Sequence, residues 1–151
     1  MATSVPFLLL LSVIHTSLGC SCVESSEKEM FCNADWVGLF KILEKPPRDD
    51  NRTLEYRAGI VKMFKSSNSS LTNGLRVSLE TSVSAGLCGI EWLQTGKLYL
   101  LSGKVDGRVL KTSLCGQLFL EEWQKVPKRV KVQLKHRNYN SCASSTKRPS
   151  L

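Results

Sequence analysis

The sequence predicts a mainly β domain, built as a small closed or nearly closed barrel and held together by disulfides. Five strand-like segments follow one another with turns between them, which is typical of small all-β barrels. Six cysteines occur in a chain of 151 residues, and an even number in a short chain indicates disulfides. An uncharged apolar segment at the start indicates export to a compartment where disulfides form.

Residues 1–19 have the features of a secretory signal peptide. They contain no Asp, Glu, Lys or Arg, Pro6–Ile14 is almost wholly apolar, and small residues stand at the first and third positions before Cys20. The apolar run is too short to span a membrane, and no second one follows. We therefore expect cleavage before Cys20, a secreted domain over residues 20–142 and a basic, disordered tail over residues 143–151.

The first three strand segments are separated by polar turns. Cys32–Glu44 is a mixed apolar run that ends near Pro46 and Pro47, which mark a turn. Leu54–Phe64 is rich in β-branched and aromatic residues and predicts the second strand, followed by a Ser/Asn loop over Ser66–Gly74. In Leu75–Leu79 apolar and polar residues alternate, which predicts a half-buried strand.

The later part of the chain predicts a hairpin and then one ambiguous element. Lys97–Val105 and Arg108–Cys115 flank Asp106-Gly107, a strong signal for a two-residue hairpin turn. Beyond Trp123 the pattern changes, and Pro127 is a suitable first residue of a helix. The apolar residues fit either one face of that helix or a strand, and both interpretations stay open: Val126, Val130 and Leu134 for the helix, Val130, Val132 and Leu134 for the strand.

All six cysteines lie after the predicted cleavage point, at positions 20, 22, 32, 88, 115 and 142. We expect three disulfides, with the pairing left open by the sequence. A structural zinc site is the alternative, but it needs compact ligand pairs such as C-x-x-C, and the sequence has none. Two sequons, at Asn51 and Asn68, predict glycan acceptors on surface loops of a secreted protein.

The formal net charge of +8 bears on the partners of the protein. Outside cells, a basic surface favours heparan sulfate or another acidic matrix component rather than nucleic acid. The alternative is that the excess charge only keeps the protein soluble. The candidate matrix-binding residues cluster in the basic stretch near the end of the chain: Lys125, Lys128, Arg129, Lys131, Lys135 and Arg137.

The triplet Cys20-Ser21-Cys22 suggests a specific chemistry. In an extended segment, side chains two residues apart point the same way, so both cysteines face the body of the protein and Ser21 faces outward. Cleavage before Cys20 frees its α-amine, which with the carbonyl oxygen of the same residue can chelate a metal ion. An α-amine with a pKa of about 8 keeps a neutral fraction at physiological pH. Two crosslinks make this chelator rigid, so it loses less entropy on binding.

An ordered set of motifs resembles one family, the tissue inhibitors of metalloproteinases. The resemblance covers essentially the whole predicted mature chain, with all six cysteines in register. The matching motifs are Cys20-Ser21-Cys22, Cys32-Asn33-Ala34-Asp35, Leu87-Cys88-Gly89, Leu98-Tyr99-Leu100-Leu101-Ser102-Gly103-Lys104 with Asp106-Gly107, and then Cys115, Trp123, Tyr139 and Cys142.

The resemblance implies a netrin-like, five-stranded OB barrel with a few short helices. It also implies the disulfides Cys20–Cys88, Cys22–Cys115 and Cys32–Cys142. The implied function is a secreted inhibitor, in the extracellular space or matrix, of secreted or membrane-anchored zinc metalloendopeptidases of the matrix metalloproteinase type. The protein would need no cofactor of its own and would act on the zinc of its target.

The resemblance further assigns roles to residues on two segments. The Cys20 amine and carbonyl would displace the zinc-bound water of the protease, and Ser21 would enter the pocket beside the zinc. Val23 would extend the contact along the cleft. The loop Ala85-Gly86-Leu87, tethered by Cys88, would occupy the other side of the cleft.

The departures from the family pattern are also informative. Glu24, Ser26 and Glu27 stand where the family usually has Pro, His and Pro, so we expect a looser segment with added negative charge. Gly86 stands where a larger polar residue is common. The chain stops where vertebrate members continue, so functions of a second domain are not expected. No serine-protease triad, phosphate loop or H-E-x-x-H motif is present, so the protein is not expected to be an enzyme. The rival function is a netrin-like module that binds matrix without inhibiting proteases.

Overall fold

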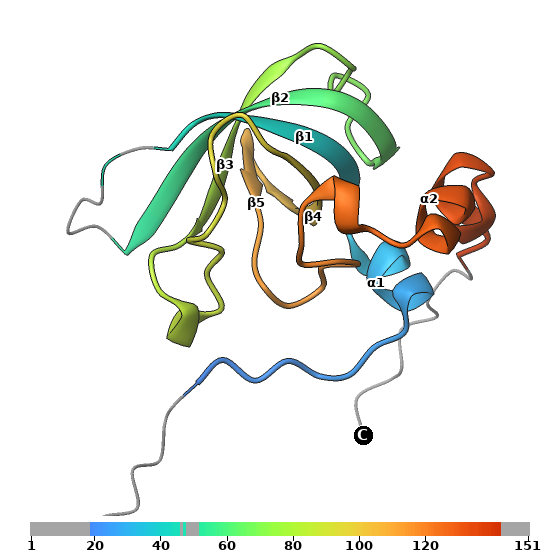
Figure 1. Ribbon diagram of the computed structural model, residues 1–151, viewed down its shortest axis with the longest axis horizontal. Helices are drawn as coiled ribbons and strands as arrows, with labels where there is room; N and C mark the ends of the chain where they lie inside the picture. The colour runs from blue at the N-terminus through green and yellow to red at the C-terminus, as the bar shows by residue number, and fades with distance from the viewer. Residues whose placement is uncertain (1–18, 46, 48–51, 143–151) are drawn as a thin grey trace, which may run out of the picture.

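Five strands close into a barrel in the computed structural model, which describes residues 19–45, 47 and 52–142 (Figure 1). The predicted leader apart from Gly19, the predicted tail and Asn51 lie outside the described residues. The strand order around the barrel is β1-β2-β3-β5-β4, which confirms the predicted five-stranded OB-type barrel. The strands are β1 (Trp36–Glu44), β2 (Thr53–Ser66), β3 (Arg76–Ser82), β4 (Leu98–Asp106) and β5 (Val109–Lys111).

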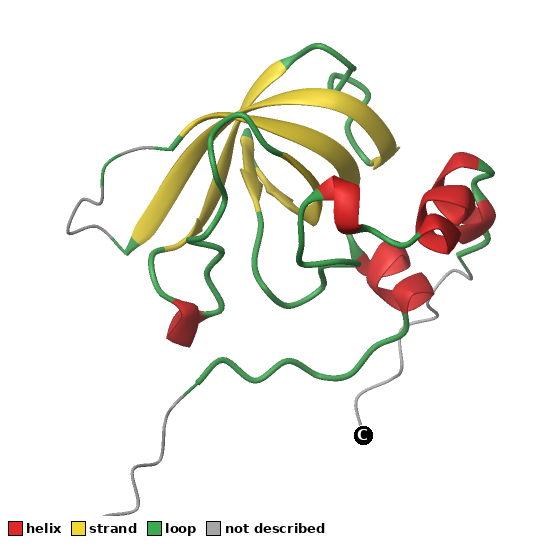
Figure 2. Ribbon diagram, in the orientation of Figure 1, coloured by secondary structure: helices red, strands yellow, loops and turns green. Residues whose placement is uncertain are grey.

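Two α-helices and three short 3-10 helices complete the described part of the chain. Figure 2 shows both α-helices on the same side of the barrel. None of the helices in this part is long and apolar enough to cross a membrane. The helices are α1 (Glu27–Asn33), η1 (Ala85–Leu87), η2 (Trp123–Lys125), α2 (Lys128–Lys135) and η3 (Asn138–Asn140).

The short strand β5 closes the barrel. It pairs antiparallel with β4 and parallel with β3, where Leu110 lies opposite Leu79. The approach of β4 to β5 requires Gly103, because a Cβ there would lie 1.9 Å from the carbonyl oxygen of Lys111. The predicted strand Arg108–Cys115 is wrong in length, because the chain leaves the sheet after Lys111 and becomes the loop that carries Cys115.

Residues 36–40 of strand β1 are buried on both faces, which explains why no polar residue interrupts this part of the strand. Trp36 and Phe40 point into the barrel core, whereas Val37 packs with the helices outside the barrel. A strand covered on both sides loses the alternation expected of a half-buried strand. The predicted run Cys32–Glu44 is wrong at its start, because β1 begins at Trp36 and Cys32 lies in α1.

Of the two α-helices, α2 lies where the sequence offered a helix as one of two alternatives, whereas α1 lies where no helix was predicted. The helical alternative for the basic stretch is confirmed, with Val130 and Leu134 buried in α2 and Val132 half exposed. Helix α1 was not expected. Its local signal was Ser26 followed three residues later by Glu29, a capping box in which Glu29 N donates to Ser26 Oγ and Ser26 N donates to Glu29 Oε2.

Candidate functional site

The N-terminal segment, residues 20–26, runs in an extended path across one end of the barrel (Figure 1). Two disulfides tie it down, Cys20–Cys88 with a Cα–Cα distance of 5.0 Å and Cys22–Cys115 with 5.4 Å. Ser21 between them is exposed, and the Val23 side chain is 91% exposed. The third disulfide, Cys32–Cys142, joins α1 to the end of the described chain. These are the pairs that the family resemblance implied.

The first two disulfides lie against each other. The Cys115 Sγ is 3.6 Å from the Sγ atoms of both Cys20 and Cys88, and all four sulfurs lie within 4.8 Å of one another. The cluster has the spacing of a metal site, but sulfurs bonded in disulfides offer no thiolate ligand. Its role is mechanical, because it joins the start of the N-terminal segment to two loops at once.

The loop that carries Cys88 has a fixed base and an exposed tip. Residues 85–87 are exposed, with Leu87 at 60%. Below them, a Cβ on Gly89 would lie 2.0 Å from the Ser82 carbonyl oxygen, so only glycine fits at that close approach. The Cys88 carbonyl oxygen accepts a hydrogen bond from Leu114 N at 2.8 Å, which links the two disulfide-bearing loops.

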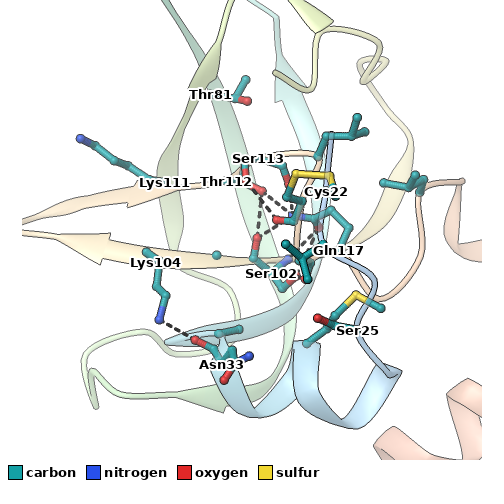
Figure 3. A pocket seen from close by; sticks show the side chains of 18 of the residues that line it. Cys22, Ser25, Asn33, Thr81, Ser102, Lys104, Lys111, Thr112, Ser113 and Gln117 are labelled. Carbon is teal, nitrogen blue, oxygen red and sulfur yellow. Dashed lines mark hydrogen bonds between the residues drawn. A yellow bond between two sulfur atoms is a disulfide. The ribbon is translucent and has the colours of Figure 1, made fainter. Parts of the chain in front are cut away.

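A cavity of about 1110 Å³ separates the N-terminal segment from the barrel end (Figure 3). Residues 22–26 line one side of it, and the ends of the strands line the other. On the barrel side, Gln117 Nε2 donates to the Ser102 and Ser113 carbonyl oxygens at 2.9 and 2.7 Å, while its Oε1 accepts from Ser102 N. This buried network uses the polar atoms of Gln117 internally, so we interpret it as a brace for the loop before Cys115 rather than as a ligand site.

At the far end of the segment, Glu27 joins α1 to α2. Its carboxylate accepts two hydrogen bonds from Arg129, at 2.7 and 2.6 Å, and one from the Tyr139 hydroxyl at 2.8 Å. The hydrogen bond from Arg129 is the largest cause that lowers the pKa of Glu27. Burial, followed by the bond to Glu27, raises the pKa of Tyr139 to about 12. Glu27 is therefore engaged within the protein rather than presented outward as added negative charge.

The predicted matrix-binding residues divide into two groups. Lys125 pairs with Glu121 at 3.0 Å, and Arg129 pairs with Glu27. The other four have no ion pair with a described residue: Lys128, Lys131, Lys135 and Arg137. Of the two sequons, Asn68 lies exposed on a turn, where its Oδ1 accepts from Ser70 N.

Comparison with known proteins identifies the family. The family described as Tissue inhibitor of metalloproteinase matches residues 18–150. A Caenorhabditis elegans protein provisionally named metalloproteinase inhibitor tag-225 is 34% identical over 150 residues, covering 85% of this chain and 93% of the relative.

Vertebrate relatives are more distant and longer. Metalloproteinase inhibitor 3 of Xenopus laevis is 29% identical over 93% of this chain, and metalloproteinase inhibitor 2 of Homo sapiens is 27% identical over 89%. The matches span 65% and 63% of those two proteins.

These relatives are named inhibitors, which agrees with the prediction that the chain is not an enzyme. A family match over nearly the whole chain, with the barrel and three disulfides in place, leads to one conclusion. The chain belongs to the tissue inhibitor of metalloproteinase family.

Proposed function

We propose that the protein is a secreted inhibitor of zinc metalloendopeptidases of the matrix metalloproteinase type, and that it acts through the amino terminus of the mature domain. The observation that supports this most is the N-terminal segment itself. Two disulfides hold Cys20 and Cys22 while Ser21 and Val23 remain exposed between and beside them. A crosslinked segment that presents exposed residues is suited to binding a cleft with little loss of entropy.

The proposed chemistry uses backbone atoms of Cys20. Removal of residues 1–19 frees the α-amine, whose neutral form donates its lone pair to the zinc of the target, and the Cys20 carbonyl oxygen supplies the second ligand. A catalytic zinc keeps one position for water, and the chelating pair takes that position. The resident metal belongs to the protease, and the inhibitor contributes only the ligands.

The neighbouring exposed residues supply the rest of the proposed contact. Ser21 enters the pocket beside the zinc, and its small side chain is compatible with many pocket shapes, which favours broad specificity. Val23 and Leu87 place exposed apolar surface on the N-terminal segment and on the η1 loop. Ala85 and Gly86 complete that loop, which the Cys20–Cys88 disulfide joins to the N-terminal segment.

The test is a change confined to the amino terminus. The secreted protein is first sequenced to establish that it begins at Cys20, and a variant with one extra alanine before Cys20 is then compared with it against a panel of matrix metalloproteinases. We expect the extension to abolish inhibition while circular dichroism and thermal unfolding stay unchanged. Inhibition that survives the extension, or a mature chain that begins elsewhere, would refute the mechanism.

A second candidate function, binding of a sulfated matrix glycan, is favoured by one surface feature. Lys131 Nζ lies 4.8 Å from the centre of the Trp123 ring, Lys62 Nζ lies 5.4 Å from that of Phe64, and the two rings are 6.4 Å apart. Cations above aromatic rings, without carboxylate partners among the described residues, remain available to sulfate groups.

Heparin chromatography tests this second function independently of protease inhibition. Reversing the four cations without ion pairs to glutamate (Lys128, Lys131, Lys135 and Arg137) should lower the salt concentration needed for elution. The control makes the same change in net charge with four cations on or next to the barrel strands: Lys41, Arg57, Lys97 and Lys111. An equal shift for both variants would show that only overall charge matters and would exclude a defined site.

A further inference from the structure

We propose that the ion pair between Glu27 and Arg129 positions the N-terminal segment for inhibition, so that α2 determines where the far end of that segment lies. This role rests on the proposed inhibitory function of residues 20–23. Glu27 is a positioning residue in this proposal, since it lies seven positions after Cys20 and acts through the segment between them.

The segment has no support along its middle. Val23, Glu24 and Ser25 are exposed, and the cavity of about 1110 Å³ lies between them and the barrel (Figure 3). Among the described residues, the hydrogen bonds that involve residues 23–26 all occur at Ser26. The path of this stretch is therefore determined by its two ends. The two disulfides hold the first end, and the start of α1 holds the second.

The first turn of α1 is attached to the rest of the protein by Met30, which packs against the apolar cluster under the helices, and by the polar contacts of Glu27, which lies nearest to the N-terminal segment. The last turn of α1 has anchors of its own, namely the Cys32–Cys142 disulfide and hydrogen bonds from Lys65 Nζ to the Phe31 and Cys32 carbonyl oxygens. In the first turn, the contacts between Ser26 and Glu29 are local to the helix. Glu27 is the residue of that turn whose side chain bonds to a distant part of the described chain.

The geometry makes this attachment directional. Arg129 binds both carboxylate oxygens of Glu27 in a bidentate arrangement, which fixes orientation as well as distance. The anchor itself is firm, because Val130 and Leu134 bury the inner face of α2 against the barrel. Figure 1 shows α1 beside α2, with the N-terminal segment leading directly into α1.

The primary experiment measures inhibition by the mature protein of a matrix metalloproteinase that the wild-type protein inhibits. Glu27→Gln and Arg129→Met should each raise the dissociation rate of the complex about tenfold. A change of this size is expected if the backbone of about one residue is free in the variant and must be fixed again when the complex forms. The charge-swapped double variant, Glu27→Arg with Arg129→Glu, should recover part of the loss. The matched control Glu121→Gln breaks the Lys125–Glu121 pair, which includes no residue of α1, and should leave inhibition unchanged.

A second measurement works without a protease. In ¹⁵N relaxation of the free protein, the order parameters of residues 23–28 should fall from rigid values toward flexible ones, below about 0.6, in the Glu27→Gln and Arg129→Met variants. The charge swap should restore them in part, and Glu121→Gln should leave them at the wild-type level. A purely structural role for the pair would lower global stability without this local change.

The outcomes separate this proposal from the inhibitory function. If the wild-type protein inhibits but the two single variants inhibit equally well, the positioning role is refuted. If inhibition weakens without any change in the order parameters of residues 23–28, it is refuted as well. If the wild-type protein inhibits no metalloproteinase, the proposed function fails, and unchanged order parameters would then refute the attachment of the segment too.

Discussion

At the scale of single residues, Glu27 is the departure from the family pattern with the clearest structural consequence. The family resemblance implies a proline at this position, and a glutamate there predicts added negative charge on the segment. The structure instead places at this position a carboxylate with three hydrogen bonds from Arg129 and Tyr139. The Glu27 side chain thus ties the backbone at the start of α1 to a distant helix.

The lowered pKa of Glu27 makes this contribution dependent on pH. A carboxyl group whose pKa is lower in the folded state stabilises the protein above its unfolded pKa, and the stabilisation is lost as pH falls through the folded pKa. The difference in unfolding free energy between wild type and Glu27→Gln should therefore be constant from neutral pH to about pH 5 and shrink on further acidification. Urea unfolding at a series of pH values measures it, and a difference that grew toward acid pH would contradict the assignment.

Gly89 supports the Cys88 loop at the same scale. Because a Cβ would lie 2.0 Å from the Ser82 carbonyl oxygen, Gly89→Ala should cost about 3 kcal/mol of unfolding free energy, as overpacking does. Gly96→Ala is the control. Gly96 has a positive φ of 84° but open space around it, so its substitution should cost only about 1 kcal/mol. Equal losses in chemical denaturation would mean that the close approach is relieved by movement of the loop.

At the scale of elements, the N-terminal segment is an extended strap held at both ends. Its importance comes from two disulfides that close long stretches of chain, with sequence separations of 68 and 93. The third disulfide has a separation of 110 but lies at the other end of α1. The effect of a disulfide on the unfolding free energy can therefore be separated from the effect of its position relative to the N-terminal segment.

Paired serine substitutions make that test. Replacing Cys22 and Cys115, or Cys32 and Cys142, should lower the unfolding free energy by similar amounts, about 4.7 kcal/mol each in the loop-entropy model. The loss of inhibition should be much larger for the first pair, because only that pair releases the segment beside Ser21. Unfolding in urea and inhibition assays measure the two effects, and equal losses of inhibition would argue against a local role of Cys22–Cys115.

Most of the elements were predictable, and the errors have definite causes. Alternation in β3 is a local signal, and the structure has it. The hairpin after β4 is also present, but the predicted turn residues Asp106-Gly107 are wrong by one position: Asp106 pairs with Val109, and the turn consists of Gly107, which has a positive φ, and Arg108. The boundary near Cys32 was wrong because α1 leads into β1 after only two residues, and both contribute buried apolar side chains. The length of β5 was wrong because pairing with β3, rather than local pattern, decides where that strand ends.

At the scale of the whole molecule, two apolar clusters share the same strands. Tyr99 and Leu101 of β4 belong to the cluster inside the barrel, whereas Leu100 between them belongs to the cluster under the helices. A strand that contributes to both clusters couples them, so neither should unfold alone.

Native-state hydrogen exchange can test this coupling. The slowest amides of β2 and of α2 should exchange with the same free energy, equal to that of global unfolding. A control measurement of global stability by denaturant unfolding gives the reference value. Exchange from α2 at a clearly lower free energy would show that the helices open as a separate unit.

Composition, local pattern and motif are enough to predict the mainly β class and the disulfide-bonded cysteines, and they indicate which segments form the candidate site. Which charges are paired, and how α1 meets α2, depends instead on long-range packing. Glu27 and Arg129 are 102 positions apart, and no local pattern encodes a contact between them. That contact exists because the closed barrel, the two buried helix faces and the Cys32–Cys142 disulfide bring both ends of the domain to one place.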